Sequence, residues 1–192
     1  MIKNAITLSL LAMALSTATA YAEDNVSGGT ITINGAISDT TCTINGGKTA
    51  DFTVDLSPIT VADAGTSVGI ITKNQKAFAM TFTNCTQGEN KDSLTMYFSS
   101  ANNISTDGKY LINTSVNEAD PLVARNVGFA LSTNDEKSTP IALDKPFDTK
   151  IKGNQTGVVE TLTLYASYYK PNVTEAKPGE LHSNVTYTII YL

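Results

Sequence analysis

Apolar and polar residues alternate along most of the chain, and the three- to four-residue spacing of an amphipathic helix is scarce. Short clusters of Gly, Asn, Asp, Ser and Pro interrupt the alternation and predict turns. Only the stretch 57–69 could hold one short helical turn. Many short strands joined by polar turns predict an all-β fold, an antiparallel sandwich of one domain. The predicted strands are residues 30–38, 51–56, 77–85, 93–100, 126–132, 158–169 and 184–192.

The first predicted strand, 30–38, departs from its own pattern. Ile31, Ile33 and Ile37 share one face of the strand, but position 35 on that face is a glycine. Glycine adds no packing in a strand and has an entropic cost there. In an ordinary sheet, Gly35 would therefore be a defect.

The first 22 residues have the pattern of a secretory signal peptide. Lys3 supplies the positive charge, an apolar core follows, and Ala20-Tyr21-Ala22 fits the small-residue rule for cleavage. The apolar core is shorter than the roughly 20 residues that span a bilayer. We predict cleavage before Glu23, with cleavage after Ala20 as the alternative, and an exported mature protein.

The sequence contains two cysteines, Cys42 and Cys85, and one histidine, His182. An even number of cysteines in an exported chain predicts a disulfide, and a metal site would need more Cys or His ligands. The formal net charge of −5 becomes −6 once the single charge of Lys3 is removed. Because Lys and Arg are not clustered, we expect no binding of nucleic acid and no docking on anionic lipid.

The chain has none of the motifs that are typical of an enzyme. It contains no G-x-S-x-G nucleophile motif, phosphate-binding loop, dinucleotide fingerprint or Ca²⁺-loop spacing. His182 lies in a turn-like segment, where a lone histidine is expected at the surface. The carboxylates are scattered through turns, which does not favour the carboxylate pair of a glycosidase. We therefore predict no catalytic residue and no cofactor.

The last predicted strand, 184–192, is apolar up to its final residue. Terminal residues commonly fray, so this strand is expected to be held either by a partner or by the rest of an ordinary sandwich. One face of the strand carries Val185, Tyr187, Ile189 and Tyr191.

In combination, these features resemble the structural subunits of bacterial chaperone–usher fimbriae, especially the major subunit of type 1-like fimbriae. That family has a penultimate tyrosine, matched by Tyr191, and a glycine fourteenth from the end, matched by Gly179. The stretch "VSGGTITINGAI" is similar to the family's donor strand, and a cysteine follows it at Cys42. The second family cysteine ends a strand, as Cys85 does here. The resemblance extends over essentially all of the mature chain.

The resemblance implies an incomplete immunoglobulin-like sandwich that lacks its last strand and is completed by a strand from another subunit. Residues 23–38 would be the donor-strand extension and residues 39–192 the body of the subunit. Gly179 would be a turn residue with positive φ. The implied donor-strand residues are Val26, Ile31, Ile33, Gly35 and Ile37. The implied residues of the acceptor groove and of chaperone recognition are Tyr187, Ile189 and Tyr191.

The same resemblance implies partners and a location. The partners are other copies of the chain, related pilus subunits, a periplasmic chaperone and the outer-membrane usher, and the location is a cell-surface fimbria that supports adhesion. Gly35 would fit a shallow pocket, where the incoming strand starts to displace the chaperone. The alternatives are a fimbrial adaptor or a subunit that itself binds a host-cell receptor, an exported enzyme on a β-sandwich, and a self-contained seven-stranded domain.

Overall fold

The structure is a computed structural model that describes residues 42–48, 50–85, 93–100, 102–114, 122–134, 139–153 and 157–190. Over these residues the protein is all-β, as the sequence predicts, with one four-residue helix and one short 3-10 helix, η1 (Asn45–Gly47). No helix in these ranges is long and apolar enough to cross a membrane. The predicted signal peptide and the predicted strand 30–38 lie outside the described residues.

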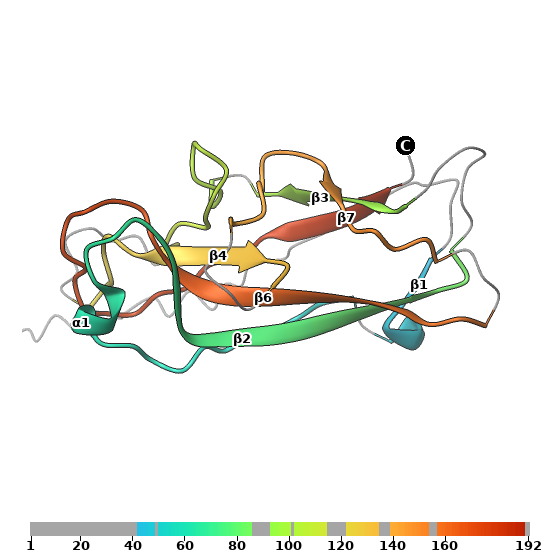
Figure 1. The fold of residues 1–192 in the computed structure, drawn as a ribbon, viewed down its shortest axis with the longest axis horizontal. Coiled ribbons are helices and arrows are strands. Elements are labelled where there is room, and N and C mark those ends of the chain that lie inside the picture. Colours follow the sequence, from blue (N-terminus) through green and yellow to red (C-terminus); the bar gives the residue numbers. More distant parts are fainter. Residues whose placement is uncertain are drawn as a thin grey trace, which may run out of the picture. The chain divides into compact units, whose positions relative to one another are not determined.

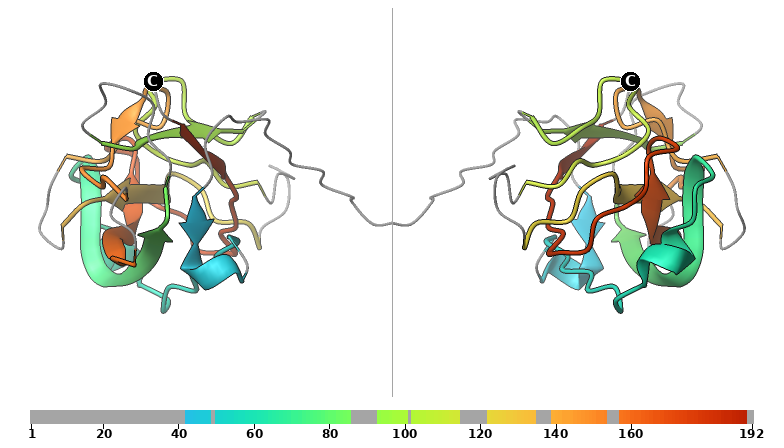
Figure 2. Two further views of the ribbon diagram at one scale, coloured as in Figure 1. Left: turned by 90° about the vertical axis from the view of Figure 1, so that its right-hand side faces the viewer. Right: turned by 90° about the vertical axis from the view of Figure 1, so that its left-hand side faces the viewer.

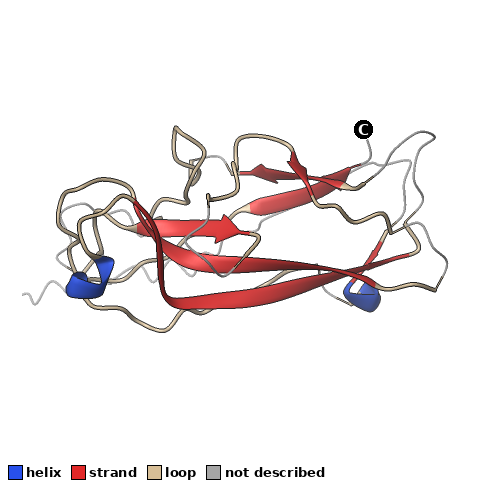
Figure 3. Ribbon diagram, in the orientation of Figure 1, coloured by secondary structure: helices blue, strands red, loops and turns tan. Residues whose placement is uncertain are grey.

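Two antiparallel sheets form the described part of the chain (Figure 1). Strands account for most of its regular structure (Figure 3). The first sheet has the order β1-β2-β6-β4, with β1 (Thr43–Ile44), β2 (Gly69–Thr83), β6 (Glu160–Lys170) and β4 (Gly128–Ser132). The second has the order β5-β3-β7, with β5 (Phe147–Asp148), β3 (Thr95–Ser99) and β7 (Thr186–Ile190).

Most of the predicted elements are present. Segments 93–100, 126–132 and 184–192 contain β3, β4 and β7, segment 158–169 contains all of β6 except its last residue, and the helical turn within 57–69 is α1 (Val61–Ala64). The N-terminus of α1 has a capping box, in which the Thr60 and Asp63 side chains each accept a backbone N–H from the other residue. Strands β1 and β5 were not predicted, because two residues are too few to display alternation.

Strand β2 is longer than the predicted segment 77–85. It begins at Gly69 and pairs with β6, with a register shift between Ile71 and Lys76. Polar residues occupy this shift, and one of them, Asn74, has a φ of 56°. A bulge interrupts the two-residue period, so the alternation alone did not reveal the first part of the strand.

The hydrophobic core lies between the two sheets, which Figure 2 shows from both ends of the strands. Every second residue of a strand faces the same side of the sheet, and in the middle of β2 and β6 this side is apolar. Burying one large apolar side chain contributes roughly 2 kcal/mol to stability. The largest fully buried apolar side chains are Phe82, Met80, Leu94, Met96, Leu143 and Leu164.

The predicted disulfide joins Cys42 to Cys85. Cys42 precedes β1 and Cys85 follows β2, so the bond closes the end of this strand pair. Gly153 lies against it, and its carbonyl accepts the Cys85 N–H at 2.8 Å. A Cβ atom on Gly153, whose φ is 65°, would lie 2.5 Å from Cys85 Sγ. Glycine at position 153 is therefore favoured both by the backbone conformation and by the close approach.

Candidate functional site

Residues 50–56 are extended but pair with no strand in the described part of the chain. The prediction of a strand at 51–56 is therefore wrong, although the side-chain pattern on which it rested is present. Phe52, Val54 and Leu56 are partly buried against the core, and the residues between them are exposed. The alternation reports that one face is buried. It does not report whether the backbone has a neighbour.

Side chains of the first sheet bond to carbonyl groups near the end of this segment and in the two residues that follow it. Lys76 Nζ donates to the Asp55 carbonyl at 3.1 Å. Asn74 Nδ2 donates to Ser57 at 3.2 Å and to Pro58 at 2.7 Å, and the Tyr168 hydroxyl donates to Ser57 at 3.3 Å. The N–H groups from Phe52 to Ser57 donate no hydrogen bond to the described residues, so these donors stay available.

Strand β7 provides the second unpaired edge of this region. Within the described residues it pairs only with β3, so its other edge has no strand beside it. All of its residues are partly exposed, and Tyr187 and Ile189 pack against the core. An edge of this kind presents N–H and C=O groups that can accept a further strand.

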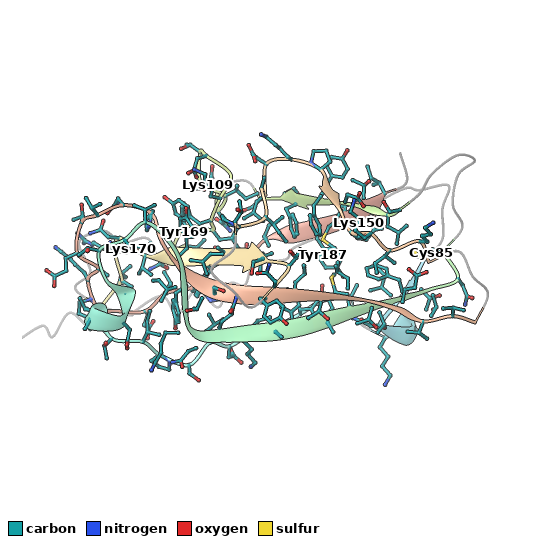
Figure 4. The ribbon with its side chains drawn as sticks, viewed as in Figure 1. Cys85, Lys109, Lys150, Tyr169, Lys170 and Tyr187 are labelled. Carbon is teal, nitrogen blue, oxygen red and sulfur yellow. A yellow bond between two sulfur atoms is a disulfide. The ribbon has the colours of Figure 1, made fainter. Side chains whose placement is uncertain are left out.

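Tyr187 connects β7 with residues 50–56. Its hydroxyl donates a hydrogen bond to the Ala50 carbonyl at 2.5 Å, and its ring centroid lies 6.3 Å from that of Phe52. Burial raises the pKa of Tyr187 to about 12, and the negative charge of Asp51 contributes to this rise. A side chain, and not a backbone ladder, therefore bridges the two edges; Figure 4 shows Tyr187 between the sheets. We call the region between residues 50–56 and β7 the open edge site.

The open edge site contains part of the predicted acceptor groove. Tyr187 and Ile189 lie on it, whereas Tyr191 lies outside the described residues. The predicted donor-strand residues Val26, Ile31, Ile33, Gly35 and Ile37 also lie outside them. Sequence reasoning missed the opposite border, formed by Phe52, Val54 and Leu56. Their alternation with polar residues was the available signal, and it was interpreted as an ordinary strand.

Gly179 lies away from the open edge site, where two segments of backbone cross. Its φ is 151°, and a Cβ atom there would lie 2.4 Å from the Leu122 carbonyl oxygen and from the Ala124 nitrogen. The neighbouring Glu180 N–H donates to the Leu122 carbonyl at 2.6 Å. Position 179 thus combines a backbone conformation that favours glycine with a contact that excludes a side chain.

Comparisons with known proteins agree with this architecture. A family model described as fimbrial protein matches residues 31–192. The major fimbrial subunit SMF-1 of Stenotrophomonas maltophilia (strain K279a) is 32% identical, and the match covers 87% of this chain and 94% of that protein.

Two solved structures have the same fold. A chain from a chaperone–usher pilus structure that concerns rod uncoiling matches with a TM-score of 0.55 and 16% identity, over 86% of this chain and 96% of that one. The P pilus rod subunit PapA matches with a TM-score of 0.50 and 15% identity, over 86% of this chain and 100% of that one. The fold is thus that of the immunoglobulin-like pilus subunits.

These relatives are structural pilus components and not enzymes. Proteins of this kind are exported through the periplasm and displayed on the cell surface. The chain belongs to the fimbrial protein family and is a fimbrial subunit.

Proposed function

We propose that this subunit polymerises head to tail by donor-strand exchange, with residues 23–38 of one copy occupying the open edge site of the next. The observation that carries the proposal is the pair of unpaired edges. On one side is the free edge of β7, and on the other are the backbone N–H groups from Phe52 to Ser57. One strand inserted between them would pair with both edges and cover the partly buried apolar side chains.

The donor segment has the composition that this role requires. Burial of Ile31, Ile33 and Ile37 would contribute roughly 2 kcal/mol each, and Val26 somewhat less. Gly35 would fill the position where the facing pocket is shallow. Because a head-to-tail contact does not close on itself, repetition generates an open filament.

Assembly requires that the open edge site be covered before a neighbouring subunit arrives, since an exposed edge promotes aggregation. A periplasmic chaperone would cover it first, recognising Tyr187, Ile189 and Tyr191, and the exchange would take place at the outer-membrane usher. The signal peptide, residues 1–22, would be removed on export, leaving the extension 23–38 and the body 39–192. The finished fimbria would support adhesion.

Deleting residues 23–38 tests the proposal. Fimbriae should disappear from the cell surface in electron micrographs, while the truncated subunit still co-purifies with its chaperone. A truncated subunit that is a stable monomer without any partner would show that no strand is missing.

A pair of single substitutions tests the open edge site itself. Val54→Asp places a charge among the partly buried side chains, whereas Thr53→Asp places the same charge on the exposed face of the same segment. We expect Val54→Asp to abolish fimbriae and Thr53→Asp to leave them. Equal numbers of fimbriae in the two variants would contradict the proposal.

The donor strand has a matched pair of its own. Gly35→Leu should block polymerisation while chaperone complexes form at normal yield. Thr32→Leu, on the other face of that strand, should polymerise normally. Normal polymerisation of Gly35→Leu would remove the role given to this glycine.

A further inference from the structure

A cleft of about 380 Å³ lies at a different place from the open edge site. Its walls come from three separate stretches of chain, within residues 110–113, 123–127 and 171–172. None of these residues borders the open edge site. The volume lies within the range of small-ligand pockets, which starts at roughly 300 Å³.

A buried ammonium group holds two walls of the cleft together. Lys170 is 0% exposed, and its Nζ donates to the carbonyl of Asn126 at 3.1 Å and to the carbonyl of Thr174. Asn126 belongs to one wall, and Thr174 follows the turn that forms another. Lys170 makes no ion pair with any described residue. These two carbonyl acceptors offset part of the cost of burying the ammonium group, and Lys170 holds the walls together without itself lining the cleft.

Arg125 is the one charged residue among those that line the cleft. It is the only arginine in the sequence, and it makes no ion pair with the described residues. Its backbone pairs with that of Lys177, a further exposed cation, at 3.0 and 3.3 Å. The carboxylates of Glu175 and Glu180, on the same stretch of chain, are exposed and likewise form no described ion pair. The planar guanidinium group matches the geometry of a carboxylate.

The rest of the lining suits a sugar ring better than a bare anion. The ring of Tyr110 is held by stacking on Tyr169, with centroids 5.1 Å apart and planes 14° apart (Tyr169 is labelled in Figure 4). This fixed aromatic face can pack against the apolar face of a sugar. Asn126 and Asn172 belong to the same lining. Asn126 Nδ2 donates to the Glu175 carbonyl and Asn172 Oδ1 accepts the Thr174 N–H, so Asn126 Oδ1 and Asn172 Nδ2 are the amide atoms that can bond to hydroxyls.

We propose that this cleft binds a carboxylate-bearing sugar, a sialic acid or a uronic acid, with Arg125 pairing with the carboxylate and Tyr110 packing against the ring. The proposal rests on the proposed function to the extent that the cleft must be open on the assembled fimbria. It does not involve the residues that are proposed to join the subunits.

Saturation-transfer NMR on purified fimbriae tests this proposal. N-acetylneuraminic acid and glucuronic acid are the two probes, and glucose, which lacks the carboxylate, is the control. At least one sugar acid should give transfer signals, and comparing the two acids identifies the source of the carboxylate. Glucose should give none. No signal from either acid, or equal signals from glucose, would overturn the proposal.

Arg125→Gln and Lys73→Gln form a matched pair, because each removes one positive charge and Lys73 is an exposed residue of β2 outside the cleft. Arg125→Gln should weaken binding of the sugar acid by about tenfold or more, and Lys73→Gln should leave it unchanged. Electron microscopy of both variants should show normal fimbriae, which separates ligand binding from assembly. Unchanged binding by Arg125→Gln fimbriae would refute the assignment.

Discussion

Replacing Gly153 with alanine should destabilise the protein more than replacing Gly157, although both glycines have left-handed backbone conformations. Their φ angles are 65° and 77°. A Cβ atom on Gly157 would meet nothing within 4 Å, whereas one on Gly153 would lie 2.5 Å from Cys85 Sγ and 2.8 Å from Cys85 Cβ. The pair therefore separates the cost of the backbone conformation from the cost of the contact.

The two costs have different magnitudes. A non-glycine residue in a left-handed conformation costs about 1 kcal/mol, and this applies to both variants. Overpacking beside the disulfide adds about 1–3 kcal/mol for Gly153→Ala alone. The backbone at position 153 has little freedom to move away, because its N–H donates to the Glu160 carboxylate at 2.9 Å and its carbonyl accepts the Cys85 N–H. We expect losses of about 1 kcal/mol for Gly157→Ala and about 2–4 kcal/mol for Gly153→Ala.

Urea unfolding of the full mature chain, followed by far-ultraviolet circular dichroism, gives the two free energies. Repeating both substitutions in a Cys42→Ala/Cys85→Ala background removes the sulfur atoms. The excess cost of Gly153→Ala should then shrink, and its size is the coupling between the glycine and the disulfide. Equal losses for the two glycine variants in the wild-type background would refute the reasoning.

Two further predictions concern pH. Tyr187→Phe removes the hydrogen bond to the Ala50 carbonyl and should cost about 1 kcal/mol near neutrality. Because the pKa of Tyr187 rises in the folded protein from 10.0 to about 12, stability should be full below pH 10 and decline as the pH rises toward 12. In the Phe variant, the urea midpoint should fall less between pH 10 and pH 12 than it does in the wild-type protein. Asp148 shows the opposite case. Hydrogen bonds from Lys150 and Ser93 lower the pKa of Asp148 from 3.8 to about 2. Their contribution to the stability of the folded protein is therefore present above pH 3.8 and is lost as the pH falls toward 2. In the Asp148→Asn variant, the midpoint of thermal unfolding should fall less between pH 3.8 and pH 2 than in the wild-type protein. An unchanged dependence of the midpoint on pH would contradict the assignment.

The fold could be predicted from sequence wherever burial and strand pairing coincide. In β6 and β7 every second residue faces the core, so the alternation located both strands. The register shift within β2 broke the two-residue period and hid the first part of that strand. At 51–56 the alternation correctly indicated one buried face, but no strand of the described residues pairs with this backbone, and the Asp55 carbonyl accepts the Lys76 side chain instead.

The two proposed surfaces were predictable only in part, for a related reason. That Tyr187 and Ile189 share one face of a strand could be predicted, because the sequence displays the pattern of that strand, whereas their place in a groove was implied by the family resemblance. The cleft could not be predicted, since its walls come from three stretches that only the tertiary structure brings together. Arg125 could be recognised as the single arginine, but whether a carboxylate of the described residues lies beside it depends on the tertiary structure.

The position of the disulfide determines how the body would carry a mechanical load. A pull on the chain ahead of Cys42 would otherwise act on β1, which is attached to β2 through only two residue pairs and could be peeled away one pair at a time. The bond to Cys85 transfers that force covalently to β2. Strand β2 lies between β1 and β6 and pairs with β6 on both sides of its register shift. In a fibre joined through residues 23–38, tension would therefore reach the long strand β2 directly and bypass the two residue pairs that hold β1.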